Sequence, residues 1–180
     1  MTPQKKDPLL TAARFLLVAF IAVLGFAGAM VALAIPFIVI FQDRALAEIA
    51  KEGITAGPEF IGALVLLLAG IAALLALAVY FLVLLRRIVL SVGEGDPFVP
   101  ANGDRLARMG WVALAGQLAS LPIGGIAMWV AEIVQDKDKF SIGDDFGLDF
   151  GGFLLVLILF ILARVFRHGT RMREELEGTV

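Results

Sequence analysis

The chain has 180 residues, of which 60% are hydrophobic and 18% are charged, and its formal net charge is -2. Soluble domains have about 45–50% apolar residues, so this composition indicates a membrane protein with the lipid bilayer as its partner. The small negative charge gives no support to direct nucleic-acid binding, which relies on neutralising phosphates. The absence of cysteine excludes disulfides, thiolate catalysis and cysteine-ligated metal sites.

The first of four predicted membrane spans covers residues 15–41, which carry no charge. A basic start before an apolar run also fits a secretory signal, and residues 27–29, Ala-Gly-Ala, resemble a cleavage site. The apolar part of a signal peptide is only about 7–15 residues long. This run is longer, so we expect a retained span, which Pro36 should kink or end near its outer end.

A polar connection, residues 42–59, separates this span from the second one, residues 60–85. Leu46, Ile49 and Ala50 recur at helical spacing, which fits a short amphipathic helix on the surface or a solvated extension. The second span is uncharged and, at about 1.5 Å per residue, crosses a hydrocarbon core of about 30 Å.

A polar passage rich in proline and glycine, residues 86–109, then joins two apolar halves from the same side of the membrane. Asn102 stands where a residue could cap the next helix through its side-chain oxygen. Gly93 and Gly95 invite comparison with phosphate-binding loops. A strand-to-helix context is missing, so we expect no nucleotide and no other cofactor.

The third span, residues 110–134, is the least purely apolar one. Gly116, Ser120 and Gly124 are spaced by four, and such a small-residue face lets another helix approach closely in lipid. Polar groups at membrane depth usually face protein or water, and backbone freed by a proline needs a partner. The candidate polar face at membrane depth is therefore Gln117, Ser120 and Pro122. Helix packing is the plainer interpretation of the same residues.

The outer connection, residues 135–150, contains five aspartates. Counted from Asp136, it has no glycine at the sixth position and no glutamate at the twelfth, so it does not match the helix-loop-helix calcium pattern. We expect a solvated acidic loop without a metal. Alternating apolar residues on both sides of residues 143–145 predict a small β-hairpin within this loop.

The fourth span, residues 148–166, leads into a polar tail, residues 167–180, so both termini lie on one side. Eleven of the 15 Lys and Arg residues belong to that side: Lys5, Lys6, Arg14, Arg86, Arg87, Arg105, Arg108, Arg164, Arg167, Arg171 and Arg173. The other side has Arg44, Lys51, Lys137 and Lys139. Because short cytosolic loops carry the excess of cations, both termini should be cytosolic. The predicted fold is an all-α membrane protein, one integral domain over residues 1–180, with four transmembrane helices in an antiparallel bundle.

Two passages, residues 85–111 and 154–180, resemble the bacterial membrane family known as domain of unknown function 2975. In that family the inner loop resembles G-x-P-F followed by N-x-x-R-L, and the tail often ends E-L-T-V. Here the tail ends with Gly178 in place of the leucine. The resemblance implies a four-span protein of the bacterial cytoplasmic membrane without an assigned activity. It also implies a cytosolic partner, because genes of such proteins often lie beside one for a small helix-turn-helix regulator.

The first function that we expect is an interaction or regulatory module. Its candidate partner contacts are Asp96, Pro97, Phe98, Asn102 and Arg105. A structural role is the alternative, in which Phe98 tucks under the helix ends and Arg105 pairs with Asp96 or Glu94.

The second function is a small transporter or channel for a neutral solute, lined by the third span. The spans contain no acid or base at mid-depth, which disfavours ion coupling. An enzyme is not expected, because no catalytic set of side chains shares one depth and one side. The small-residue faces would serve packing within one chain or in a homo-oligomer equally well.

Overall fold

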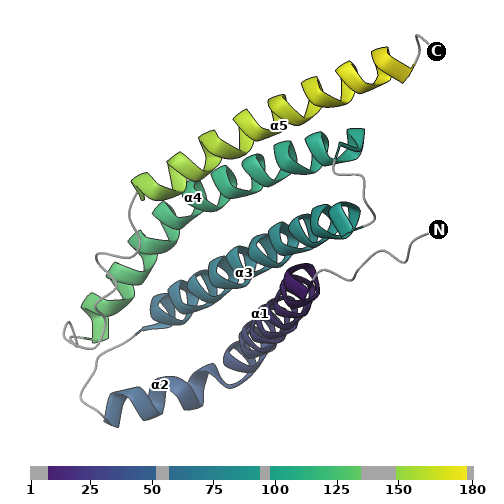
Figure 1. Cartoon of the computed structure of the whole chain (residues 1–180). Coiled ribbons are helices and arrows are strands. Elements are labelled where there is room, and N and C mark those ends of the chain that lie inside the picture. The colour runs from purple at the N-terminus through teal and green to yellow at the C-terminus, as the bar shows by residue number, and fades with distance from the viewer. Residues whose placement is uncertain (1–7, 52–56, 94–97, 135–148, 178–180) are drawn as a thin grey trace. The chain divides into compact units, whose positions relative to one another are not determined.

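The computed structural model describes residues 8–51, 57–93, 98–134 and 149–177. They form five helices, shown in Figure 1: α1 (Pro8–Ile40), α2 (Gln42–Lys51), α3 (Pro58–Gly93), α4 (Pro100–Val134) and α5 (Phe150–Glu177). The described residues contain no strand, so the expected all-helical class is confirmed for them. The hairpin predicted in the outer loop falls on residues 135–148, which lie outside the described part.

Four helices, α1, α3, α4 and α5, are long and apolar enough to cross a membrane. At most 22% of the most apolar stretch of each is buried within the chain. Apolar surface of this extent would be costly in water and is suited to lipid. The chain thus has the features of a multi-pass membrane protein, as its composition predicted.

The helices extend beyond the predicted spans because their polar ends continue the helical backbone. α1, α3 and α4 each begin with a proline, whose missing N–H costs nothing at a first helical position. α1 also contains Pro36 and continues to Ile40, so Pro36 does not end it. The backbone N–H of Phe41 donates to the carbonyl of Phe37 at 3.1 Å, so α1 passes into α2 with little interruption.

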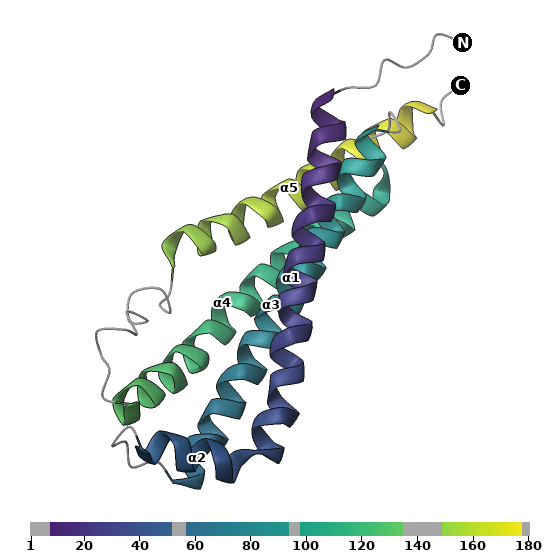
Figure 2. The same cartoon turned by 90° about the horizontal axis from the view of Figure 1, so that it is seen from below.

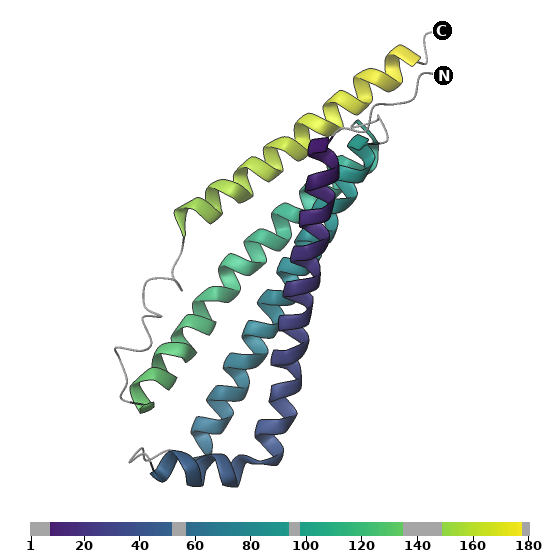
Figure 3. The same ribbon diagram turned by 60° about the horizontal axis from the view of Figure 1, so that its bottom comes forward.

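Contacts divide the chain into two compact units, and α1, α3 and α4 each contribute to both. Unit 2 comprises Gly25–Ala76 and Gly116–Asp149. Its core consists of Phe60, Ile61, Ala63 and Leu67 of α3 with Ile123, Ala127 and Val130 of α4. Ala45, Leu46 and Ile49 of α2 pack against this core, and Figures 2 and 3 show α2 turning across the start of α3. The amphipathic segment is therefore a helix, and its apolar face rests on protein.

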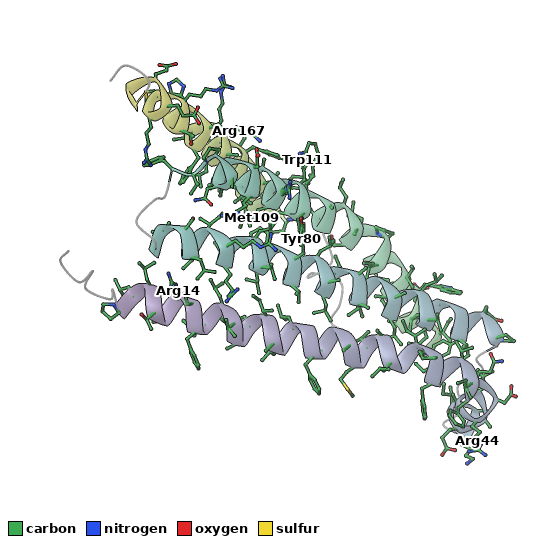
Figure 4. All side chains as sticks on the ribbon, turned by 90° about the vertical axis from the view of Figure 1, so that its right-hand side faces the viewer. Arg14, Arg44, Tyr80, Met109, Trp111 and Arg167 are labelled. Atoms are coloured by element: carbon green, nitrogen blue, oxygen red, sulfur yellow. The ribbon has the colours of Figure 1, made fainter. Side chains whose placement is uncertain are left out.

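Unit 1 comprises Met1–Leu24, Leu77–Ala115 and Phe150–Val180. Its buried core consists of Leu84 of α3, Leu106 and Met109 of α4, and Leu159 and Ala163 of α5. The rings of Trp111 and Phe160 meet edge to face with centroids 5.4 Å apart, which joins α4 to α5. Figure 4 labels Met109 and Trp111 on α4.

Candidate functional site

A buried polar cluster in unit 1 connects the end of α3 to the start of α4. The Nδ2 group of Asn102 donates to the Oγ of Ser91 at 2.8 Å, and the Ser91 hydroxyl donates to the carbonyl of Ile88 at 2.8 Å. The Oδ1 of Asn102 accepts from a guanidinium nitrogen of Arg105 at 2.8 Å. Asn102 is 0% exposed. We call Ser91, Asn102 and Arg105 the polar junction. A buried amide is stable there because its donor and acceptor are both paired.

The prediction that Asn102 caps the third helix is wrong. The helix already begins at Pro100, and the backbone N–H of Asn102 donates to the carbonyl of Val99 at 2.9 Å. Pro100 can occupy the first helical position, so the helix starts earlier than a cap at Asn102 would allow. The Asn102 side chain is free to turn toward α3 instead.

Arg105 fastens α4 to α3. The nitrogen that reaches Asn102 also lies 3.3 Å from the carbonyl oxygen of Arg87, and it donates to both acceptors. The carboxylates expected as alternatives, Glu94 and Asp96, lie outside the described residues, and so does Pro97. Arg105 thus has a structural role, because it connects α4 to α3.

Phe98 packs against α5 from the end of the central passage. Its ring centroid lies 5.5 Å from that of Phe166, and its carbonyl accepts a hydrogen bond from the Thr170 hydroxyl at 3.1 Å. A Cβ at Gly169 would meet the Phe98 ring at 3.1 Å, so the glycine permits this close approach. Phe98 is still 43% exposed. The residue therefore packs against α5 and keeps part of its surface accessible.

An ion pair adds a second tie between the start of α4 and α5. A guanidinium nitrogen of Arg167, which Figure 4 labels, lies 3.0 Å from a carboxylate oxygen of Asp104. The two side chains are 50% and 63% exposed, so the pair contributes only about 0.2–1 kcal/mol. Its main effect is to orient Arg167 toward α4.

The start of α1 joins the same unit through Arg14. A guanidinium nitrogen of Arg14 lies 3.5 Å from the carbonyl of Leu90. The Nε atoms of Arg14 and Arg86 are buried and find no hydrogen-bond partner among the described residues. Leu90 lies one turn after Arg86 on the same face of α3. Arginine side chains of α1, α4 and α5 therefore all have polar contacts within unit 1.

The candidate polar face at membrane depth belongs to unit 2. The hydroxyl of Ser120 donates to the carbonyl of Gln117 at 2.7 Å, and the Gln117 amide donates to the carbonyl of Asp149 at 3.2 Å. Pro122 is exposed, and a Cβ at Gly116 would meet nothing within 4 Å. The structure brings Gln117 and Ser120 together and pairs both within the chain. Among the described residues of this unit, Gly116 makes no close contact with another helix.

Sequence reasoning missed Ser91 and Thr170, which are buried polar residues of unit 1. Each is a lone hydroxyl in a helix segment that is otherwise apolar or cationic. That isolation is the signal that could have identified them, because a hydroxyl at such a place needs a partner. No three His, Asp or Glu side chains of the described residues lie close enough together to hold a metal ion.

A family model described as protein of unknown function (DUF2975) matches residues 48–180. The match includes α3, α4 and α5, with the polar junction and the Phe98 contact, and it begins after α1. No curated protein and no solved structure matches the chain. Because the matched segment is well over half of the 180 residues, the chain belongs to the DUF2975 family.

Proposed function

We propose that α1, α3, α4 and α5 cross the bacterial cytoplasmic membrane as an antiparallel bundle. The spans would lie near residues 15–41, 60–85, 110–134 and 148–166, with a cytosolic loop at 86–109 and a cytosolic tail at 167–180. The length and apolar surface of the helices support this arrangement. The distribution of Lys and Arg supports the cytosolic placement of both termini.

Cysteine labelling tests this topology directly, because the chain has no cysteine of its own. We expect Ala47→Cys, on exposed α2, to react with a membrane-impermeant maleimide in intact spheroplasts. Ala101→Cys and Arg171→Cys should react only after the membrane is permeabilised. The reverse pattern, or equal labelling of all three, would contradict the proposed orientation.

The function that we propose is an interaction module that presents a cytosolic surface to a soluble partner. This proposal depends on one observation: the two passages that resemble the family, the central one and the C-terminal one, contact each other in unit 1. Phe98 and Asp104, from the central passage, contact Phe166, Thr170 and Arg167 of α5. A surface built from two chain segments, of which the α4 part is also tied to α3 by the polar junction, has the preformed geometry that specific recognition favours.

The partner that best fits the family resemblance is a small helix-turn-helix regulator held at the membrane. Exposed cations of unit 1, such as Arg87, Arg108 and Arg171, would attract an acidic face of that partner and raise the rate of association. A neutral-solute path past Gln117, Ser120 and Pro122, in one chain or a homo-oligomer, has weaker support. Gln117 and Ser120 already pair within unit 2 and leave few free polar groups for a solute.

Site-specific photocrosslinking in native membranes tests the interaction. A photoreactive residue at Ala101 or at Arg171, both exposed in unit 1, should give an adduct with the same soluble protein, identified by mass spectrometry. The control position is Leu33, which is exposed on α1 within the first span, and there we expect no adduct with a soluble protein.

Two outcomes would overturn the interaction module. The first is adducts at positions 101 and 171 only with lipid or with a second copy of the chain. The second is equal capture of the soluble protein from position 33. If solute flux in liposomes were then abolished by Gln117→Leu, the transporter alternative would replace it.

A further inference from the structure

A groove of about 460 Å³ lies on α5 beside the Phe98 contact. Its lining residues are Phe98, Arg164, Val165, His168, Gly169 and Met172. All of them belong to unit 1. Phe98, Val165 and Met172 leave between 43% and 54% of their surface exposed, so the walls are open and apolar.

Two nitrogen-bearing side chains stand on this apolar groove. Arg164 and His168 are four residues apart on α5, which places them on the same face of the helix. Neither has a hydrogen bond or an ion pair with any described residue, whereas the nearby Arg167 is paired with Asp104. The groove therefore combines unpaired donors with apolar walls, and it suits an anionic amphiphile.

The groove lies where α5 changes from apolar to cationic. Residues 153–163 of α5 carry no charge, and Arg164 is the first of four arginines in the next ten residues. Ile161 and Val165, one turn apart, are each more than half exposed and continue the apolar surface toward the span. At such a boundary, arginine reaches the lipid headgroups while its stem stays in apolar surroundings.

We propose that this groove binds an anionic phospholipid of the cytosolic leaflet. Arg164 and His168 donate to the headgroup phosphate, Phe98 and Val165 contact the glycerol and the first acyl carbons, and the chains follow Ile161 toward the bilayer. The guanidinium geometry matches phosphate oxygens, which favours this class of ligand. The inference rests on the proposed membrane placement of α5, and it adds a lipid contact to the surface that includes Phe98.

Native mass spectrometry of the full chain in mild detergent measures this binding, with phosphatidylglycerol and phosphatidylcholine as probes. Both lipids carry the phosphate, but the choline cation of phosphatidylcholine cancels its charge and repels Arg164. We therefore expect one phosphatidylglycerol to bind about tenfold more tightly than phosphatidylcholine, a difference of about 1.4 kcal/mol. The double variant Arg164→Gln, His168→Gln should lose the preference. Arg108→Gln removes the same arginine charge from an exposed site on α4 outside the groove and should keep it.

A second variant separates groove shape from charge. Val165→Trp fills the groove beside its apolar wall and leaves both donors in place, so it should also weaken phosphatidylglycerol binding, while helix content by circular dichroism stays unchanged.

The proposal is overturned if the double variant keeps the preference, or if the unaltered chain shows none. It is also overturned if millimolar inorganic phosphate displaces the lipid, because the site would then bind a free anion. Cysteine labelling and photocrosslinking do not depend on Arg164 or His168, so they report separately on the proposed function.

Discussion

Replacement of Asn102 by leucine is expected to lower the free energy of unfolding by about 2–4 kcal/mol. Asn102 is fully buried, and its amide pairs with Ser91 on α3 and with Arg105 on α4. Leucine has the same number and branching of side-chain heavy atoms but offers neither a donor nor an acceptor. The variant therefore loses the hydrogen bonds to Ser91 and to the charged guanidinium of Arg105, whereas the longer contact of Arg105 with the carbonyl of Arg87 remains.

The measurement is the free energy of unfolding in mild detergent titrated with a denaturing detergent. The matched control is Ser120→Ala, which also removes a polar group from α4. The Ser120 hydroxyl donates only to a carbonyl of its own helix, so we expect a change within about 0.5 kcal/mol. If Asn102→Leu cost no more than this control, the polar junction would not hold unit 1 together.

Gly70→Leu should destabilise unit 2 by about 1–3 kcal/mol through overpacking. A Cβ at position 70 would lie 2.7 Å from the Cγ1 and 3.0 Å from the Cδ1 of Ile123. Ile123 is buried in the core with Ala127 and Val130, and its branched Cβ restricts its rotamers. The Ile123 side chain therefore cannot move away easily, and α3 and α4 must separate locally to make space for the leucine.

Gly62→Leu is the matched control, because it makes the same change on the same helix where nothing lies within 4 Å. Leucine favours a helix over glycine by up to about 1 kcal/mol, so this variant should be neutral or slightly stabilising. Opposite signs at positions 70 and 62 would show that the close contact determines the effect. A loss of stability of equal size at both would show that the contact with Ile123 is unimportant.

Composition and run length were enough to predict four long apolar helices, because a bilayer allows few other ways to pair the backbone. The same reasoning did not establish α2, since Leu46 and Ile49 fit a helix but a solvated extension was the plainer interpretation. Packing against the core of unit 2 decided this segment, and the residues of that core lie more than ten positions away in the chain.

The candidate site was predictable only in part. Phe98, Asn102 and Arg105 stood out because they lie in the long polar passage between two apolar halves and match the loop pattern of the family. Their partners did not stand out, since Ser91 precedes Asn102 by 11 residues and Thr170 follows Phe98 by 72. A hydrogen bond over such a separation depends on how the helices pack, and it cannot be predicted from one sequence.

The sequence by itself therefore determined the membrane character of this protein, because long uncharged runs favour lipid and their polar connections favour water. It also determined the uneven distribution of cations, which depends only on the order of residues. Only the tertiary structure decided that Asn102 is a buried link and not a cap, and that Gln117 and Ser120 pair within unit 2. The physical reason is that burial in lipid is set by local composition, whereas the pairing of a polar side chain depends on distance and angle between helices that are far apart in the chain.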